Sequence, residues 1–135
     1  MIHSIGVDIV EIGRMREALR RRSGLRERLF TPRERTYCDR HPDAAPYYAV
    51  RFAAKEAVAK AAGRHLRWQE VEVVHDAAGR PGVRVSGESA EWAGVTRGAE
   101  FLISLSHSRE YAVAMALLQM PLQAPEEPWY PRALV

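Results

Sequence analysis

The chain has 135 residues, of which 47% are hydrophobic and 27% charged, and its formal net charge is +3. This length and composition predict one globular domain with a real core and argue against a two-domain enzyme. No apolar run approaches the ~18 residues of a membrane span, and the first residues lack a signal peptide. We therefore expect no membrane association and a cytoplasmic location.

Cysteine and arginine usage narrow the chemistry. Cys38 is the only cysteine, which excludes an internal disulfide or a Cys-based zinc site and predicts a buried apolar thiol. Ten of the first forty residues are Arg, whereas the whole chain has two Lys. Such a patch suits nucleic acid, phosphate or an acidic protein, and it is also typical of a solvated helix surface. We expect no nucleic acid, because the segment lacks interleaved aromatic residues and known nucleic-acid motifs.

The first half of the chain predicts one strand and three helices. Residues 2–10 have the apolar character of a strand, and apolar residues recur at helical spacing over 12–22 before Ser23-Gly24 ends that helix. Thr31-Pro32-Arg33-Glu34 is a helix-start signature with a capping box. A long Ala-rich helix then covers 46–62 and is closed by Gly63.

The second half predicts two hairpins separated by a helix. Residues 70–74 and 83–85 favour strands on either side of a Gly- and Pro-containing turn. Residues 88–95 favour a helix. Residues 101–105 and 111–117 alternate in hydrophobicity, which predicts two antiparallel strands joined by a short loop.

The resulting order, β-α-α-α-β-β-α-β-β, predicts an α+β fold in which a mainly antiparallel sheet packs on the long Ala-rich helix. We expect this domain to cover residues 1–120. Four of the residues in 121–135 are Pro, so we expect this Pro-rich tail to be extended, either packed over the body or partly disordered, and without chemistry of its own.

Two acids interrupt otherwise apolar segments: Asp8 lies in the first strand and Glu56 in the long helix. A carboxylate near a core is costly unless it is paired, hydrogen-bonded or bound to a metal. Asp8 could instead cap the next helix or face solvent, and Glu56 could pair with Lys60 one turn later. Together the two acids suggest a hard-oxygen site for a shared cation, as expected for Mg²⁺ completed by water and phosphate.

Cations and one histidine near these segments could serve a phosphate. On a helical wheel, Arg51 and Lys55 fall together and Lys60 falls with Glu56, so the helix could present one acid among three cations. His107 lies between the last two predicted strands, beside two serines and an arginine. It is either a solvated side chain or part of a phosphate or base-catalysis corner.

The chain resembles the holo-acyl-carrier-protein synthase family, the short single-domain 4′-phosphopantetheinyl transferases. The resemblance covers about residues 2–118, and the order and separation of its segments fit that family. It rests mainly on Gly6-Val7-Asp8-Ile9-Val10-Glu11-Ile12, Arg51-Phe52-Ala53-Ala54-Lys55-Glu56-Ala57 and Ile103-Ser104-Leu105-Ser106-His107-Ser108.

This resemblance implies transfer of 4′-phosphopantetheine from coenzyme A to a serine of apo acyl carrier protein, with release of 3′,5′-ADP. Asp8 and Glu56 would match the family's Mg²⁺ ligands, and the metal would stabilise charge that develops at the coenzyme A pyrophosphate. Lys60 and Arg51 would hold phosphates. Glu56, a water on the metal, or His107 would take the serine proton.

The resemblance also implies partners. Arg14 matches a family position that contacts the acidic recognition helix of the carrier, and Arg20 and Arg21 would extend this docking surface. Members of the family that this chain resembles form trimers with active sites between neighbouring subunits, so the resemblance also implies a homotrimer.

One loop departs from the family pattern. A Gly-Thr-Gly-like loop usually follows the long helix near the nucleotide, whereas this chain has Gly63-Arg64-His65-Leu66. Gly63 is kept, and Arg64 could supply a phosphate contact in place of the lost one. The altered loop motivates an alternative, a catalytically inactive relative that acts as a carrier-binding module.

Overall fold

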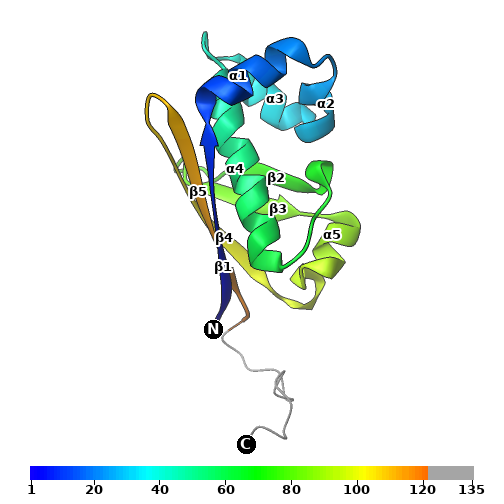
Figure 1. Cartoon of the computed structure of the whole chain (residues 1–135). Helices are drawn as coiled ribbons and strands as arrows, with labels where there is room; N and C mark the ends of the chain where they lie inside the picture. The colour runs from blue at the N-terminus through cyan, green and yellow to red at the C-terminus, as the bar shows by residue number, and fades with distance from the viewer. Residues whose placement is uncertain (122–135) are drawn as a thin grey trace, which may run out of the picture.

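The Ala-rich helix α4 (Ala45–Ala62) is the centre of the fold, and the sheet and the shorter helices lie around it (Figure 1). The computed structural model describes residues 1–121. The elements are β1 (Ile2–Glu11), α1 (Ile12–Arg21), α2 (Leu25–Leu29), α3 (Pro32–Asp39), α4, η1 (Trp68–Glu70), β2 (Val71–His75), β3 (Pro81–Val85), α5 (Gly87–Trp92), η2 (Val95–Arg97), β4 (Glu100–His107) and β5 (Tyr111–Gln119).

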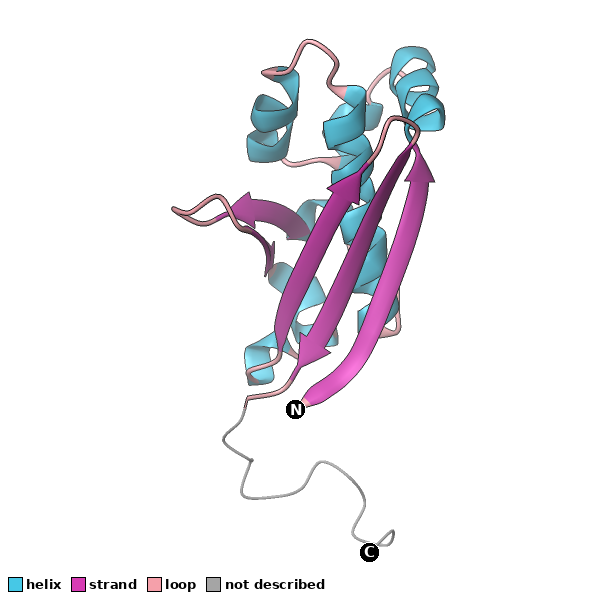
Figure 2. Cartoon of the chain, turned by 90° about the vertical axis from the view of Figure 1, so that its left-hand side faces the viewer, coloured by secondary structure: helices cyan, strands magenta, loops and turns pink. Residues whose placement is uncertain are grey.

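The strands β1, β5 and β4 form an antiparallel sheet whose inner face packs on α4. Side chains alternate between the two faces of a strand, so Ala114 and Ala116 are fully buried while Met115 between them is 46% exposed. Figure 2 shows that no helix of residues 1–121 covers the outer face. The predicted α+β fold, with an antiparallel sheet packed on the Ala-rich helix, is confirmed.

Small residues let the backbones of α4 and β1 come into direct contact. A Cβ placed on Gly6 would lie 2.1 Å from the Ala57 carbonyl oxygen and 2.8 Å from the Ala61 nitrogen. The Ser4 hydroxyl donates to the Ala61 carbonyl on the same face. Because strand side chains alternate, Asp8 follows Gly6 on this face and is directed toward α4.

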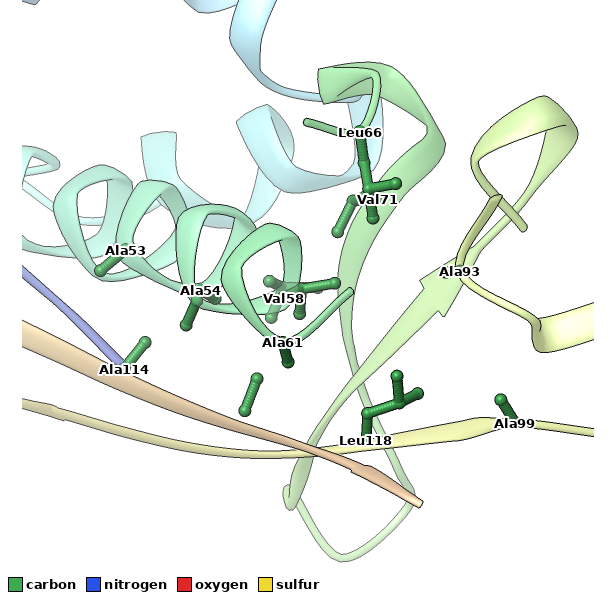
Figure 3. Close-up of a cluster of buried hydrophobic side chains, with 13 residues drawn as sticks. Ala53, Ala54, Val58, Ala61, Leu66, Val71, Ala93, Ala99, Ala114 and Leu118 are labelled. Atoms are coloured by element: carbon green, nitrogen blue, oxygen red, sulfur yellow. The ribbon is translucent and has the colours of Figure 1, made fainter. Parts of the chain in front are cut away.

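The core consists of two clusters along α4. The first joins the C-terminal half of α4 to the sheet and to the β2–β3 hairpin, and it includes Val58, Val71 and Leu118 (Figure 3). The second joins the N-terminal half of α4 to α1, α2 and α3, and it includes Tyr48 and Cys38. Cys38 is fully buried as predicted, and burial raises the pKa of its thiol to about 12.

The predicted helix ends are close to those observed. Thr31 accepts a hydrogen bond from the Glu34 backbone at 3.2 Å and donates its own N–H to the Glu34 carboxylate at 2.9 Å, which completes the capping box. Gly63 closes α4 with a φ of 78°, a left-handed conformation that glycine adopts without strain.

The five-residue helix α2 was not predicted. Gly24, with a φ of 82°, does end the path of α1, but the chain then forms another helical turn because Leu25 and Leu29 are buried. Similarly, the helix predicted over 88–95 is divided into α5 and η2. In both places burial decides the local structure that turn signals alone leave open.

None of the helices within residues 1–121 is long and apolar enough to cross a membrane. The Pro-rich tail predicted for 121–135 lies, beyond Pro121, outside the described residues.

Candidate functional site

A groove of about 650 Å³ runs between β1, α1, α2 and α4. Its rim carries acids and arginines, and its floor is apolar. This combination is typical of a binding site that orients a charged ligand over a hydrophobic surface. The lining residues are Asp8, Ile9, Val10, Glu11, Arg14, Met15, Ala18, Arg22, Leu25, Arg28, Leu29, Phe52, Glu56 and Trp68.

Asp8 and Glu56 both line this groove although they are 48 positions apart in the sequence. The close contact at Gly6 is what brings the Asp8 side chain to α4. Burial raises the pKa of Glu56, and the negative charge of Asp8 raises it further. The fold therefore holds two like charges together, an arrangement that a bound cation would relieve.

Lys60 lies beside this pair of acids. Its ammonium donates to the Val7 carbonyl at 2.9 Å and to Asp8 Oδ1 at 3.1 Å. Asp8 does not cap the next helix, because α1 is preceded by Glu11 and has no side-chain cap, and its side chain, 17% exposed, does not simply face solvent. In place of the expected ion pair between Glu56 and Lys60, Lys60 is bonded to Asp8.

The idea of one acid among three cations on α4 is wrong for Lys55. Its ammonium is buried on the opposite flank, 2.8 Å from both the Glu34 carboxylate and the Trp68 carbonyl. The Lys55 side chain is only 1% exposed, and the Glu34 side chain 0%. Lys55 is therefore a structural residue, and it cannot reach a ligand in the groove.

Arg51 also lies away from Asp8 and Glu56. It lines a second cavity of about 460 Å³ between α3, α4 and β2, together with Arg40, Tyr37 and His75. Its guanidinium is 4.1 Å from the centre of the Tyr37 ring, and its Nε has no hydrogen-bond partner among the residues described. The cavity is thus basic, and it contains a buried cation whose hydrogen-bonding capacity is not fully used.

His107 ends β4 near this second cavity. Its ring lies 5.8 Å from that of Tyr47, whose carbonyl accepts a hydrogen bond from Arg51 at 3.2 Å. His107 does not line the groove that contains Asp8 and Glu56. Within one chain, Arg51 and His107 thus lie apart from Asp8 and Glu56.

Five of the ten arginines in the first forty residues fall into two sets. Arg14, Arg22 and Arg28 line the groove. Arg20 and Arg21 instead contact Glu17, with the Arg20 guanidinium 2.6 Å from its carboxylate. The first three are placed to meet a ligand in the groove, whereas the other two are engaged on the exposed side of α1.

The loop after α4 carries the remaining candidates. Gly63 is the C-cap of the helix, and the Arg64 guanidinium lies 3.9 Å from the centre of the Trp92 ring. Arg67 approaches the same ring at 5.3 Å. Arg64 is therefore placed on α5, separate from the residues that line the groove.

Sequence reasoning missed the apolar part of the groove. Phe52 and Trp68 stack with ring centres 5.3 Å apart, and Leu25 and Leu29 of α2 lie on the same lining. The signal available was the pair of leucines four positions apart after Gly24. No sequence pattern indicates that Trp68 would come to lie against Phe52.

Comparison with known proteins places the chain in a family. A family model for the 4′-phosphopantetheinyl transferase superfamily matches residues 4–116. A holo-[acyl-carrier-protein] synthase from Geobacter metallireducens is 43% identical over 124 residues, covering 88% of this chain and 98% of that protein. One from Geobacter sulfurreducens is 42% identical over 127 residues, covering 90% and 100%.

Solved structures agree. A holo-(acyl-carrier-protein) synthase from Bacillus anthracis, crystallised in complex with CoA (3′,5′-ADP), has a TM-score of 0.74 at 32% identity, covering 90% of this chain and 99% of that one. The acyl carrier protein synthase of Mycobacterium tuberculosis has a TM-score of 0.72 at 35% identity, covering 90% and 100%. Sequence motifs, fold and comparisons thus converge: the chain belongs to the 4′-phosphopantetheinyl transferase superfamily.

Proposed function

We propose that this protein is a holo-acyl-carrier-protein synthase, which transfers 4′-phosphopantetheine from coenzyme A to a serine of apo acyl carrier protein. The observation that carries the proposal is the pairing of Asp8 and Glu56 in a groove rimmed by Arg14, Arg22 and Arg28. The relatives named holo-acyl-carrier-protein synthase, matched over nearly their full length, support it.

The reaction is a phosphoryl transfer. The carrier serine oxygen forms a bond to the phosphorus that bears pantetheine, the P–O bond within the pyrophosphate breaks, and 3′,5′-ADP leaves. The serine proton must go to a base. Glu56 is one candidate, because its carboxylate lines the groove in which the serine would meet the phosphate. His107 is the second candidate, from the other flank of α4.

The residues present fit Mg²⁺. Asp8 and Glu56 offer hard carboxylate oxygens, and within residues 1–121 no group of three metal-binding side chains occurs, so water and phosphate would complete the coordination. Bound there, the metal would neutralise charge at the transferring phosphate. Lys60 adds a cation beside Asp8, exposed enough to reach a phosphate oxygen.

The separation of the predicted site residues on α4 and its neighbours supports a site shared between copies of the chain. Arg51 and His107 were predicted to contact coenzyme A, yet they lie apart from Asp8 and Glu56. In a homotrimer, the basic cavity of one protomer could face the groove of its neighbour. Gly63 and Arg64 would then lie near the nucleotide between them.

The outer face of the sheet supports this assembly. Large apolar side chains are more than 40% exposed there, which is unusual unless a partner covers them. A single-chain mass in solution, measured by light scattering, would count against the trimer. The residues are Ile5, Val7, Ile9, Leu102, Tyr111 and Met115.

Carrier docking would use the arginines of the groove. Arg14, Arg22 and Arg28 are exposed and would face the acidic surface of a carrier, which steers association and fixes its orientation. Arg20 and Arg21 would widen this surface at its edge. We propose a cytoplasmic enzyme, and no partner role for nucleic acid or membranes.

The test is the mass of apo carrier protein after incubation with the enzyme, coenzyme A and Mg²⁺, across fatty-acid and polyketide carriers. We expect the carrier to gain one phosphopantetheine, and Asp8→Asn to abolish the gain while leaving the circular dichroism spectrum unchanged. A carrier that is bound yet remains unmodified after long incubation would support the alternative, a catalytically inactive carrier-binding module.

A further inference from the structure

The helix α2 is too short to be stable alone, yet it carries Leu25, Arg28 and Leu29 into the groove. Something must therefore hold it against the rest of the molecule. Burial of its two leucines, 6% and 7% exposed, fixes one side. The carbonyl groups at the C-terminal end of α2 have no partner within the helix, so they need one elsewhere.

The side-chain amide of Gln69 donates hydrogen bonds to carbonyl groups at this end of α2. Its Nε2 donates to the Glu27 carbonyl at 2.7 Å, to the Phe30 carbonyl at 2.8 Å and to the Arg28 carbonyl at 3.2 Å. One residue of η1 thus gathers the end of α2. Its neighbour Trp68 lines the groove, so adjacent residues of η1 contact the groove and the end of α2.

The segment η1 is itself anchored from below by Lys55. The buried ammonium donates to the carbonyls of Trp68 and Val71, which flank Gln69, and it pairs with Glu34. Glu34 in turn accepts a hydrogen bond from the backbone of Val73 at 2.9 Å. A buried charge with all its partners satisfied is rigid, so Gln69 projects from a fixed base.

We propose that Gln69 is a positioning residue for carrier docking, which acts by holding Arg28 of α2 at the groove. Gln69 does not line the groove, so it touches neither coenzyme A nor the acids. Loss of the hydrogen bonds from Gln69 would make α2 more mobile, so the Arg28 guanidinium would no longer have a fixed position. The positions of Asp8, Glu56 and Lys60 would not change. The inference rests on the proposed function only in naming the carrier as the ligand of Arg28.

The first experiment is steady-state kinetics of Gln69→Leu, with apo carrier and coenzyme A varied separately. We expect the KM for carrier to rise about tenfold, a typical effect of losing one well-placed polar contact, and kcat and the KM for coenzyme A to change less than about twofold. Equal increases in both KM values would overturn the proposal.

A double-mutant cycle tests whether Gln69 acts through Arg28. If it does, Gln69→Leu should add little to Arg28→Ala, because the contact that Gln69 orders is already gone. Fully additive effects on the KM for carrier would contradict this. Val95→Ala is a matched control: it removes part of a half-buried side chain in η2, remote from the groove, and should leave both KM values unchanged.

Two readouts do not depend on catalysis. Hydrogen exchange should accelerate at the amides of Arg28 and Phe30, which are bonded within and just after α2, in Gln69→Leu but not in Val95→Ala. Binding of the carrier, followed by fluorescence anisotropy, should weaken about tenfold as the KM does. If wild-type protein binds carrier but does not modify it, the proposed enzyme fails while this inference holds. Unchanged exchange in α2 would refute the inference and leave the enzyme standing.

Discussion

Lys55 and Glu56 are adjacent in the sequence but lie on different flanks of α4, and their surroundings differ completely. Lys55 is buried against Glu34 and two carbonyls, so its charge is fully compensated. Glu56 is half-buried in the groove beside Asp8, so its charge is opposed by another of the same sign. The first arrangement stabilises the fold, and the second is ready for a ligand.

The difference shows how to separate a structural charge from a functional one. Both residues interrupt an apolar helix, and the sequence alone gives them similar standing. Burial differs between them, since Lys55 is buried and Glu56 half-buried, but burial alone does not say whether a charge is structural or functional. What further distinguishes them is direct pairing: Lys55 contacts Glu34, whereas Glu56 forms no ion pair within residues 1–121, and the nearby Lys60 is bonded to Asp8. The following predictions test this contrast, in decreasing order of expected effect.

Lys55→Met should lower the free energy of unfolding by about 3–5 kcal/mol, because it leaves the Glu34 carboxylate buried without its cation. Urea denaturation monitored by circular dichroism measures this. In Lys55→Met combined with Glu34→Leu, only part of the loss should be recovered, since neither charge then remains but the N–H groups of Thr31 and Val73 lose their acceptor. A loss below about 1 kcal/mol in the single variant would mean that the pair is not structural.

Gly6→Ala should cost about 1–3 kcal/mol, because its Cβ would meet the Ala57 backbone and push α4 away from β1. The same movement would separate Asp8 from Glu56, so Mg²⁺ should bind more weakly in a calorimetric titration. Gly13→Ala is the matched control. A Cβ on Gly13, in α1, would meet nothing within 4 Å, so this change should be neutral or stabilising. Equal behaviour of the two variants would contradict the close contact.

Lys60→Met should strengthen Mg²⁺ binding to the coenzyme A-free protein about two- to fivefold, because the cation 3.1 Å from Asp8 is removed. Transfer should nevertheless fall, because a phosphate contact is lost. Calorimetry and the carrier mass assay measure the two effects. Weaker metal binding in this variant would show that Lys60 orients Asp8 instead of competing with the metal.

Glu56→Gln should slightly stabilise the metal-free protein at neutral pH. Because the pKa of Glu56 is raised in the folded state, the folded carboxyl holds its proton more tightly than the unfolded one. The protonated Glu56 carboxyl therefore stabilises the folded state at low pH, and this stabilisation is lost as the pH rises through the raised pKa. The uncharged variant should therefore be more stable by less than about 1 kcal/mol at pH 7, with no difference in acid. A pH series of thermal melts measures this difference. A variant that is less stable than wild type at pH 7 would contradict the prediction.

Much of the fold follows from the sequence because its signals are local. The capping sequence at Thr31, the alternation in the last two strands and Gly63 at the end of α4 each predict an element that the structure contains. The helix α2 escaped prediction because only the burial of Leu25 and Leu29 against other elements stabilises it.

The site could be predicted only in part. The pairing of Asp8 with Glu56 follows from motifs that resemble a family, and the structure places both acids in one groove. The roles of Lys55 and Gln69 could not be read from the sequence, because each depends on carbonyl groups of η1, β2 or α2 that only the folded chain brings near. Helical spacing places Lys55 on a face but does not say what covers that face.

The most direct test compares Glu56→Gln with wild type in two measurements on the same sample: the mass of apo carrier after incubation with coenzyme A and Mg²⁺, and the melting temperature. We expect the variant to leave the carrier unmodified while melting at or slightly above the wild-type temperature in the absence of metal. A variant that converts the carrier at the wild-type rate would show that Glu56 and the groove that it lines do not carry the chemistry.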